Sequence, residues 1–402
     1  MKRILYIHHG GALGGAPLSL LYLIRQMDRR LYEPVVLCLA SGPAVDRFRD
    51  EGIETHVTTY ASDFSHTELV WYGGKLLWQL PGKALRFWPS VTEFRRVLRR
   101  FQPDIVHLNS STLLAAARAA RREEVPVIWH IREPIAGGYL GLRRALLRRD
   151  INRYADYVIA ISEHDAAQLI PNDRIKVIHN FVEFDTFDSS IPSLPARARL
   201  NLSGAQHVVT MLGGCSEPKG TLPFVEALSV VRQKVPNVRF LLVGPRPRVG
   251  ASDLGRAWLR RLLRADAYDR SVMAVASESI ASGHIRILGQ RSDIPDVLAA
   301  SDLLVFPSIV PHFGRPIIEA GAMAKPVIVS NLGGAKELVV NGETGLLVSP
   351  GDTSELAESI TSVLTDPSQA KTMGHAGYLR ARELFDAHRN AARTFEVYAN
   401  VL

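Results

Sequence analysis

The chain has 402 residues, which is too many for one ordinary hydrophobic core and predicts two domains. Hydrophobic residues make up 47% and charged residues 22%, a composition that excludes a disordered protein. The two cysteines, Cys38 and Cys215, stand far apart without a partner at a characteristic spacing. Neither a disulfide framework nor a zinc site is therefore expected.

The net charge of +8 is unevenly distributed along the chain. Residues 71–149 hold 15 Lys and Arg against 5 Asp and Glu, a net charge of +10. This basic region favours an anionic partner, namely a membrane surface, a phosphorylated substrate or a nucleic acid.

No apolar stretch is long enough to cross a bilayer, because the best candidate, residues 69–89, contains Lys75, Pro81, Lys83 and Arg86. The basic start of the chain lacks the apolar run of a secretory signal. We therefore expect a cytoplasmic protein.

Short apolar segments alternate with helical segments over residues 1–190. The first apolar segment, residues 3–9, runs into glycines, and residues 17–27 then show helical spacing, with Pro17 suited to the first turn. Further strands are predicted at residues 34–39, 104–108, 125–131, 157–161 and 175–178. This alternation predicts a parallel sheet covered by helices on both faces.

A stretch rich in serine and proline, at about residues 185–206, predicts a linker, and the alternation then restarts. Strands are predicted at residues 208–212, 240–243, 285–288, 303–306, 327–329 and 345–348. Asp352 and Glu355 are typical of a helix start and predict a helix over residues 354–364.

The pattern predicts an α/β protein of two doubly wound, Rossmann-like domains that face each other across a cleft. The domains are expected at residues 1–190 and 200–370. The helix-like sequence of residues 371–402 is expected to cross back to the first domain. Ligands of such sheets bind beyond the carboxyl ends of the strands.

A glycine-rich loop, residues 10–16 (GGALGGA), joins the first predicted strand to the first predicted helix. Glycines allow a ligand to approach the backbone closely, and the helix start offers free amides to a phosphate. The loop is equally compatible with a tight turn. It does not match G-x-G-x-x-G, which disfavours a dinucleotide-dependent dehydrogenase.

Two motifs of the second half are suited to phosphate. Lys219, before Gly220 and a helix, can reach phosphate oxygens as a compact charge, although a solvated lysine is the simpler interpretation. The segment 313–320 (FGRPIIEA) follows a strand and begins a helix near Pro316. Its first amides are candidates for a pyrophosphate, and Glu319 is a candidate for a ribose diol.

These motifs occur in an order that resembles the group 1 (family 4) retaining glycosyltransferases, which have the GT-B fold. The resemblance rests on residues 13–16, on Lys219-Gly220, and on residues 313–320, 333–337 (GGAKE) and 341–348 (NGETGLLV). It is most specific over residues 205–365.

The resemblance implies a nucleotide diphosphate-sugar donor, either a UDP- or a GDP-sugar, and a glycan or lipid-linked acceptor. It implies that Gly14 and Gly15 lie near the donor phosphates, that Lys219 neutralises the leaving diphosphate and that Glu319 binds the ribose. Arg291 would lie near the base. The complete predicted donor-binding set is Gly14, Gly15, Lys219, Arg291, Phe313, Gly314, Arg315, Pro316, Ile317 and Glu319.

His130, in the sequence Trp129-His130-Ile131, matches the position at which the family has a histidine near the transferred sugar. With Lys219 it forms the predicted catalytic pair. A single histidine is more often structural, but this one ends a predicted strand at the edge where ligands bind.

The sequence departs from the family at two positions. Gly214 stands where relatives have an arginine, and Pro311, followed by His312, stands where they have an acidic residue that holds the donor sugar. His312 or Arg315 is a candidate to compensate for that residue.

No Asp-x-Asp pair occurs in the sequence, so a metal-bridged diphosphate is not expected, and neither is another cofactor. Charge on the leaving diphosphate would instead be met by Lys219, helix starts and glycine amides. The resemblance implies retention of the anomeric configuration.

Within the basic region, Trp71, Trp78, Trp88 and Trp129 accompany many arginines. We expect part of this region to rest on an anionic membrane surface at the inner face and to present a lipid-linked acceptor. Ordinary amphipathic helices with solvated arginines are the alternative.

Three rival functions stay open. A nucleotide-sugar epimerase has the same fold, and a non-catalytic nucleotide-sugar-binding protein is suggested by Gly214 and Pro311. A nucleic-acid-binding protein is favoured by charge alone, without a recognition-helix or RNA-binding signature. We therefore expect no nucleic-acid partner, and a role in surface polysaccharide synthesis.

Overall fold

The computed structural model describes residues 1–64, 80–135, 137–202, 204, 206–247 and 267–402. The chain forms two compact units. One comprises Met1–Phe181 together with Phe385–Leu402, and the other comprises Val182–Leu384.

The first unit is built on a parallel sheet with the strand order β3-β2-β1-β4-β5-β6-β7 among the described residues. Its strands are β1 (Lys2–His8), β2 (Tyr32–Cys38), β3 (Glu54–Val57), β4 (Ile105–Leu108), β5 (Val127–Ile131), β6 (Tyr157–Ala160) and β7 (Ile175–Val177). The central strand β1 is buried on both faces, since Leu5 and Ile7 pack on one side and Ile4 and Tyr6 on the other.

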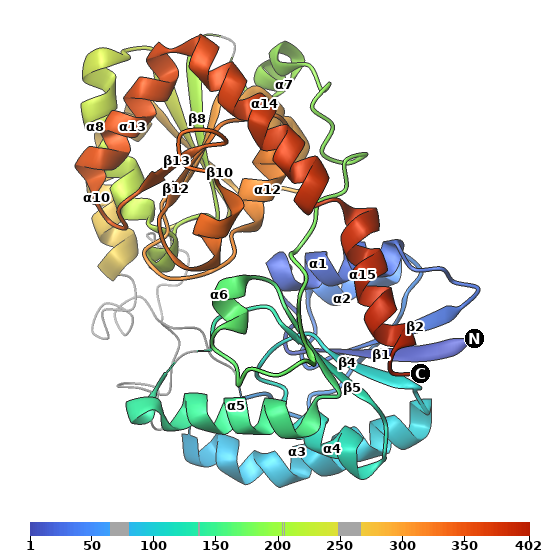
Figure 1. The fold of residues 1–402 in the computed structure, drawn as a ribbon. Helices are drawn as coiled ribbons and strands as arrows, with labels where there is room; N and C mark the ends of the chain where they lie inside the picture. Colours follow the sequence, from blue (N-terminus) through green and yellow to red (C-terminus); the bar gives the residue numbers. More distant parts are fainter. Residues whose placement is uncertain (65–79, 136, 203, 205, 248–266) are drawn as a thin grey trace. The chain divides into compact units, whose positions relative to one another are not determined.

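Helices cover both faces of this sheet (Figure 1). One face carries α1 (Gly15–Arg25), α2 (Pro43–Asp50) and the C-terminal helix α15 (Ala387–Ala399). The opposite face carries α3 (Leu80–Phe101), α4 (Leu114–Arg122) and α5 (Leu142–Tyr154). The one-turn helix α6 (Glu163–Ala166) follows β6, and the 3₁₀ turn η2 (Tyr139–Gly141) precedes α5.

The second unit has a parallel sheet with the order β10-β9-β8-β11-β12-β13. Its strands are β8 (His207–Leu212), β9 (Val238–Val243), β10 (Ile285–Gly289), β11 (Leu303–Phe306), β12 (Val327–Ser330) and β13 (Leu346–Val348). Its helices are α7 (Ser193–Arg199), α8 (Thr221–Lys234), α10 (Ala267–Ala281), α11 (Ile294–Ala300), α12 (Arg315–Ala322), α13 (Thr353–Thr365) and α14 (Pro367–Leu384), with 3₁₀ turns η3 (Glu217–Lys219) and η4 (Gly333–Leu338).

Both sheets confirm the predicted doubly wound α/β class. In the first unit the chain runs outward from β1 through β2 to β3, and β4 then pairs with the other side of β1. In the second unit it runs from β8 through β9 to β10, and β11 then pairs with the other side of β8. This reversal is the topological switch point, where loops diverge and ligands of open α/β sheets bind. The loops after β1 and β4, and those after β8 and β11, are therefore where functional groups are expected.

Every predicted strand is present among the described residues, but β3 was not predicted. Its sequence, Glu-Thr-His-Val, is polar because the strand lies at the edge of the sheet. The predicted linker contains a further element, α7, which packs against α11. Arg197 of α7 binds Asp302 at 2.6 Å and the carbonyl of Ala300 at 3.0 Å, so this stretch belongs to the second unit.

The C-terminal helices divide between the units. The domain boundaries expected from the sequence are at residues 190–200 and 371, whereas the chain passes between the two units after Phe181 and after Leu384. Helix α14 packs on α12 in the second unit, and α15 packs in the first, beginning at Asp386, whose side chain accepts a hydrogen bond from the amide of Arg389 at 3.1 Å. The predicted cap at Asp352 is confirmed by its 2.9 Å bond from the amide of Glu355. None of the helices in the described ranges is both long and apolar enough to span a bilayer.

Candidate functional site

In the second unit, the loops after β8 and β11 meet at the switch point. The Pro218 carbonyl accepts hydrogen bonds from the amide of Ile309 at 3.0 Å and from the hydroxyl of Ser308 at 2.9 Å. Gly220, with φ +73°, lies so close that a Cβ on it would be 1.8 Å from the carbonyl oxygen of Pro307. No other residue fits there, so the sequence Lys219-Gly220 fixes the position of the lysine.

Lys219 lies across the end of β8. A Cβ built on Gly213 would be 2.4 Å from Cδ and 2.8 Å from Nζ of this lysine, so the glycine makes room for the side chain. No carboxylate pairs with Lys219 among the described residues, and burial lowers the pKa of its ammonium group. A partly buried cation without a protein counter-ion is suited to an anionic ligand.

His312 faces the same place from the loop after β11. Its Nδ1 lies 3.0 Å from the carbonyl oxygen of Val310, and its Nε2 is buried without a hydrogen-bond partner among the described residues. Burial and the charge of Lys219 lower its pKa to about 4, so the ring is neutral near pH 7. Sequence reasoning named this residue only as a candidate replacement for the acidic residue.

Helix α12 carries the most specific motif. It begins after Gly314, whose φ of +77° and close contact with the Phe306 ring leave no room for a side chain. Glu319 is buried, and its Oε1 accepts a hydrogen bond from Nε of Arg315 at 3.0 Å, while Nη2 of the same guanidinium lies at the ion-pair distance of 2.9 Å. The charged pair therefore lies within the helix start rather than in solvent.

Two residues of this helix start, Pro316 and Ile317, have no free amide hydrogen for a phosphate in the structure. Pro316 has no amide hydrogen, and the amide of Ile317 donates to the carbonyl of Gly314 at 3.0 Å. Phe313 is buried, so its side chain supports the loop from the interior of the unit. The backbone of these residues therefore shapes the site, while Arg315 and Glu319 supply its polar groups.

Arg291 lies after β10, the edge strand, and not at the switch point. Its Nε donates to Asp293 at 2.7 Å, and this carboxylate raises the pKa of the guanidinium. Arg291 thus forms a partly exposed ion pair, and its place near a nucleobase stays a prediction.

In the first unit, the glycine loop follows β1 and leads into α1. Gly11 is tightly packed, because a Cβ there would lie 2.3 Å from the carbonyl oxygen of Ser41. Gly14 and Gly15 are exposed, and a Cβ on Gly14 would meet nothing within 4 Å. The loop therefore has one structural glycine, Gly11, and an open segment at the start of α1.

A polar network that sequence reasoning missed lies at the carboxyl ends of β1, β4, β5 and β7. Asn109 contacts Nδ1 of His8 at 3.2 Å and accepts a short bond from Arg132, which also donates to Asn180 at 2.6 Å. Burial lowers the pKa of His8 to about 3. The available signal was a polar residue directly after an apolar strand, namely Asn109 after β4 and Arg132 after β5.

His130 is buried inside the first unit. Its Nδ1 lies 3.2 Å from Nε2 of His107, and its own Nε2 has no hydrogen-bond partner among the described residues. Burial, Arg132 and His107 lower its pKa well below the usual value, so the ring is neutral. It lies on the face of the sheet whose buried side chains pack against α15.

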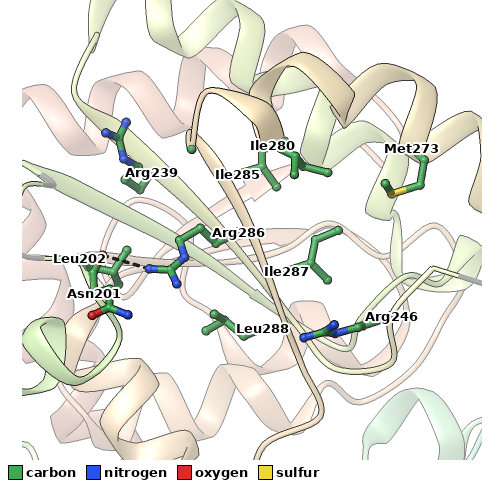
Figure 2. A pocket seen from close by; sticks show the side chains of 11 residues that line it. Asn201, Leu202, Arg239, Arg246, Met273, Ile280, Ile285, Arg286, Ile287 and Leu288 are labelled. Atoms are coloured by element: carbon green, nitrogen blue, oxygen red, sulfur yellow. Dashed lines mark hydrogen bonds between the residues drawn. The ribbon is translucent and has the colours of Figure 1, made fainter.

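A pocket of about 650 Å³ lies elsewhere, along the edge strand β10 (Figure 2). Its wall includes Ile287, Leu288 and Arg286, and Arg286 donates to the carbonyl of Asn201 at 3.0 Å. The described residues that line it include none of the predicted site residues and no carboxylate or nucleophile. We therefore place the candidate site at the switch points and not in this pocket.

Two Rossmann-like sheets with glycine loops and an unpaired lysine at the switch point are typical of nucleotide-binding proteins. Comparison with known families agrees. The family described as "Glycosyl transferases group 1" matches residues 195–380, and the "Glycosyl transferase 4-like domain" matches residues 14–180. The chain belongs to the group 1 glycosyltransferases.

Individual relatives are distant. A glycogen synthase of Mycobacterium tuberculosis is 26% identical over 75% of this chain and 69% of its own length. A lipopolysaccharide core biosynthesis mannosyltransferase, LpsB of Rhizobium meliloti, is 27% identical over 81% of this chain and 83% of its own. Anabaena HepE, solved in complex with UDP and glucose, superimposes with a TM-score of 0.78 at 24% identity, over 99% of this chain and 100% of HepE. This likeness confirms the predicted GT-B fold class.

Proposed function

We propose that this glycosyltransferase moves a sugar from a UDP- or GDP-sugar to a glycan or lipid-linked acceptor, with retention and without a metal ion. The observation that carries the proposal is Lys219, a partly buried cation with no carboxylate partner in the described structure, at the switch point of the second sheet. HepE was solved in complex with UDP and glucose, and LpsB is a mannosyltransferase, which supports a nucleotide-sugar donor.

The proposed reaction breaks the bond between the sugar carbon and the diphosphate oxygen, and negative charge grows on the departing diphosphate. Lys219 would meet this charge with its ammonium group, for which Gly213, with φ of +137° and no side chain, leaves room at the end of β8. Groups that are already in place need no reorganisation when charge develops, which is why they lower the barrier.

Glu319 is proposed to bind the ribose hydroxyls. Arg315 holds Oε1, and no hydrogen bond to Oε2 occurs within the described structure, so that oxygen can accept from a diol. The pairing with Arg315 also gives this buried carboxylate a counter-charge, since an unpaired buried charge is costly.

Retention and metal independence are tested on the reaction itself. The anomer formed first, followed by NMR, should have the configuration of the donor sugar. Transfer should continue in the presence of a strong chelator, and a complete loss that added metal restores would refute the metal-free part of the proposal.

We also propose that the first unit rests on an anionic membrane surface at the inner face through α3, α4 and α5. Leu85 is 78% exposed, Trp88 52% and Leu142 71%, and the exposed guanidinium of Arg122 lies 5.0 Å from the Trp88 ring. Such a surface combines apolar anchors with cations. Trp129 is fully buried and takes no part, while Trp71 and Trp78 lie outside the described residues.

Vesicle cosedimentation tests this surface. Binding should require anionic lipid and should weaken when Leu85 and Trp88 are replaced by serine. Equal binding to neutral and anionic vesicles, or none to either, would end the membrane part of the proposal and leave the donor site untouched.

The donor is identified by a thermal-shift screen of UDP- and GDP-sugars, followed by a transfer assay. A ligand present at 100 times its Kd and bound only to the folded chain stabilises by about 2.7 kcal/mol. Binding without transfer or hydrolysis would favour a non-catalytic protein, and interconversion of the sugar would favour an epimerase. No shift with any nucleotide would refute a donor site.

A further inference from the structure

Two polar groups without partners come together at the switch point of the second unit. The ammonium of Lys219 has no carboxylate, and Nε2 of His312 has neither donor nor acceptor among the residues that the structure describes. Ser308 joins the two loops that carry them, because its hydroxyl donates to the carbonyl of Pro218, the residue before Lys219, at 2.9 Å and lies 3.2 Å from Nδ1 of His312. Buried polar groups in native proteins nearly always have a partner, so two unsatisfied neighbours call for an explanation.

The surroundings of His312 settle which of its ring nitrogens carries the hydrogen. Nδ1 lies 3.0 Å from the carbonyl oxygen of Val310, which only accepts, and 3.2 Å from the hydroxyl of Ser308. The single hydrogen of that hydroxyl has nearer acceptors in the carbonyls of Val310, at 2.7 Å, and Pro218, at 2.9 Å, so Nδ1 is the donor of the histidine ring. Since the ring is neutral near pH 7, its other nitrogen, Nε2, holds a lone pair. That atom can only accept a hydrogen bond.

A carboxylate beside the Lys219 ammonium would pair with it and cancel its charge. A neutral imidazole instead orients the ammonium by a hydrogen bond and leaves its positive charge for an anion. The four-carbon stem of the lysine is flexible, so it gains from a fixed partner.

We propose that His312 is a positioning residue, whose Nε2 accepts a hydrogen bond from the Lys219 ammonium and holds it at the end of β8 for the donor diphosphate. The two groups are not hydrogen-bonded in the structure, and rotation of the lysine side chain closes the contact. The role of the lysine in this inference rests on the proposed function.

The test uses two substitutions that separate the ring nitrogens. His312→Asn keeps a donor near the Nδ1 position, for the Val310 carbonyl, and removes the acceptor. His312→Gln places an amide oxygen near the position of Nε2. Isothermal titration with UDP and GDP should show affinity falling about tenfold in His312→Asn, the size expected for a hydrogen bond to a charged group. It should recover to within about threefold in His312→Gln.

A double-mutant cycle with Lys219→Met shows whether the histidine acts through the lysine. In the Lys219→Met background, His312→Asn should change nucleotide affinity by less than about twofold, because the charge it positions is gone. An equal loss in both backgrounds would overturn the proposal. His284→Asn is the matched control, because Nδ1 of His284 also lies near a carbonyl, that of Val238 at 3.1 Å, but at the amino end of the edge strand β10, away from the switch point. It should leave affinity unchanged.

A second measurement needs no nucleotide. Nitrogen NMR of His312 at pH 7 should show hydrogen on Nδ1 and none on Nε2, and Lys219→Met should shift the Nε2 signal. Hydrogen on Nε2, or a signal that ignores Lys219→Met, would overturn the inference whether or not UDP binds. If the NMR result holds while neither UDP nor GDP binds the wild type, the proposed function fails and the pairing of the two residues stands.

Discussion

The hydroxyl of Tyr398 lies 2.7 Å from Nδ1 of His107 and so joins the last helix of the chain to the centre of the first sheet. The same hydroxyl contacts that of Tyr6 at 3.1 Å, and His107 continues the chain to His130. All four side chains are buried. The contact explains why α15, although last in the sequence, belongs to the first unit.

Replacing this hydroxyl should destabilise the protein. In Tyr398→Phe, the ring of His107 and the hydroxyl of Tyr6 lose a buried partner, which costs about 1–3 kcal/mol. Urea unfolding at pH 7.5 measures the change. Tyr378→Phe is the control, since no hydrogen bond to that hydroxyl occurs in the described residues, and it should be nearly neutral. Equal stability of the two variants would show that the polar chain contributes nothing.

The buried histidines predict a loss of stability in mild acid. Burial lowers the pKa of His8 to about 3 and those of His107 and His130 well below the usual value. In the unfolded chain they take up protons near pH 6.5, so below that pH the unfolded state binds more protons than the folded state. Stability is therefore full above pH 6.5 and falls as the pH drops toward the folded-state values, by up to about 1.4 kcal/mol per pH unit for each histidine.

Urea unfolding at pH 7.5, 6.5 and 5.5 tests this dependence. His130→Asn should reduce the slope by the share of one histidine, whereas the exposed His388→Gln should leave it unchanged. A stability that is flat between pH 6.5 and 5.5 would contradict neutral burial of these rings.

The sequence predicted the sheets well and the site unevenly. Strands such as residues 303–306 are apolar without interruption because helices cover both faces, so hydrophobicity alone locates them. Strand β3 was not predicted because its sequence is polar, and an edge strand tolerates polar residues on its open side. The hydrogen bond between Asn109 and Arg132 depends on strands brought together from distant parts of the chain, and no local pattern reveals that the two side chains meet.

The motif in α12 illustrates the same limit. Sequence indicated that Glu319 is not on a plain solvent face, and it is buried. Its partner Arg315 is one turn earlier in the same helix, so the pair could be anticipated from spacing. The burial of Nε2 in His312 could not be anticipated from the sequence, because it depends on how the loops after β8 and β11 meet.

In the glycine loop of the first unit, substitutions at two different glycines are expected to affect catalysis and stability separately. Gly14 is extended, with φ −155°, and has open space for a Cβ, so Gly14→Ala should change stability by less than about 0.5 kcal/mol. If a donor phosphate approaches this loop, the same variant should lower kcat/KM. Gly11→Ala should instead destabilise by about 1–3 kcal/mol, because its Cβ would overlap the backbone of residue 41. Unchanged kcat/KM in Gly14→Ala would remove the loop from the donor site.

Glu319 is predicted to distinguish ribose from deoxyribose. The wild type should bind UDP, or GDP if that is the donor nucleotide, about tenfold more tightly than the 2′-deoxy form, and Glu319→Gln should lose this preference, because a carboxylate accepts from the diol more strongly than an amide does. Titration calorimetry measures both ligands. Glu319→Gln can still accept from Arg315, whereas Glu319→Ala takes away the carboxylate of a buried pair and should cost about 3 kcal/mol of stability. A preference that survives in Glu319→Gln would place the ribose elsewhere.

Lys219→Ala should lower turnover by about 10² to 10³, the loss typical of removing one preorganised group that meets developing charge. The effect should fall on kcat more than on KM, since the diphosphate carries its full negative charge only as the bond to the sugar breaks. Lys234→Ala, at the exposed end of α8, removes a lysine of the same unit away from the switch point and should keep normal kinetics. Stability should hardly change in Lys219→Ala, because this lysine has no carboxylate partner in the described structure and its burial opposes the charge. Near-normal turnover of a correctly folded Lys219→Ala would therefore remove the lysine from the chemistry and with it the observation on which the proposed donor site depends.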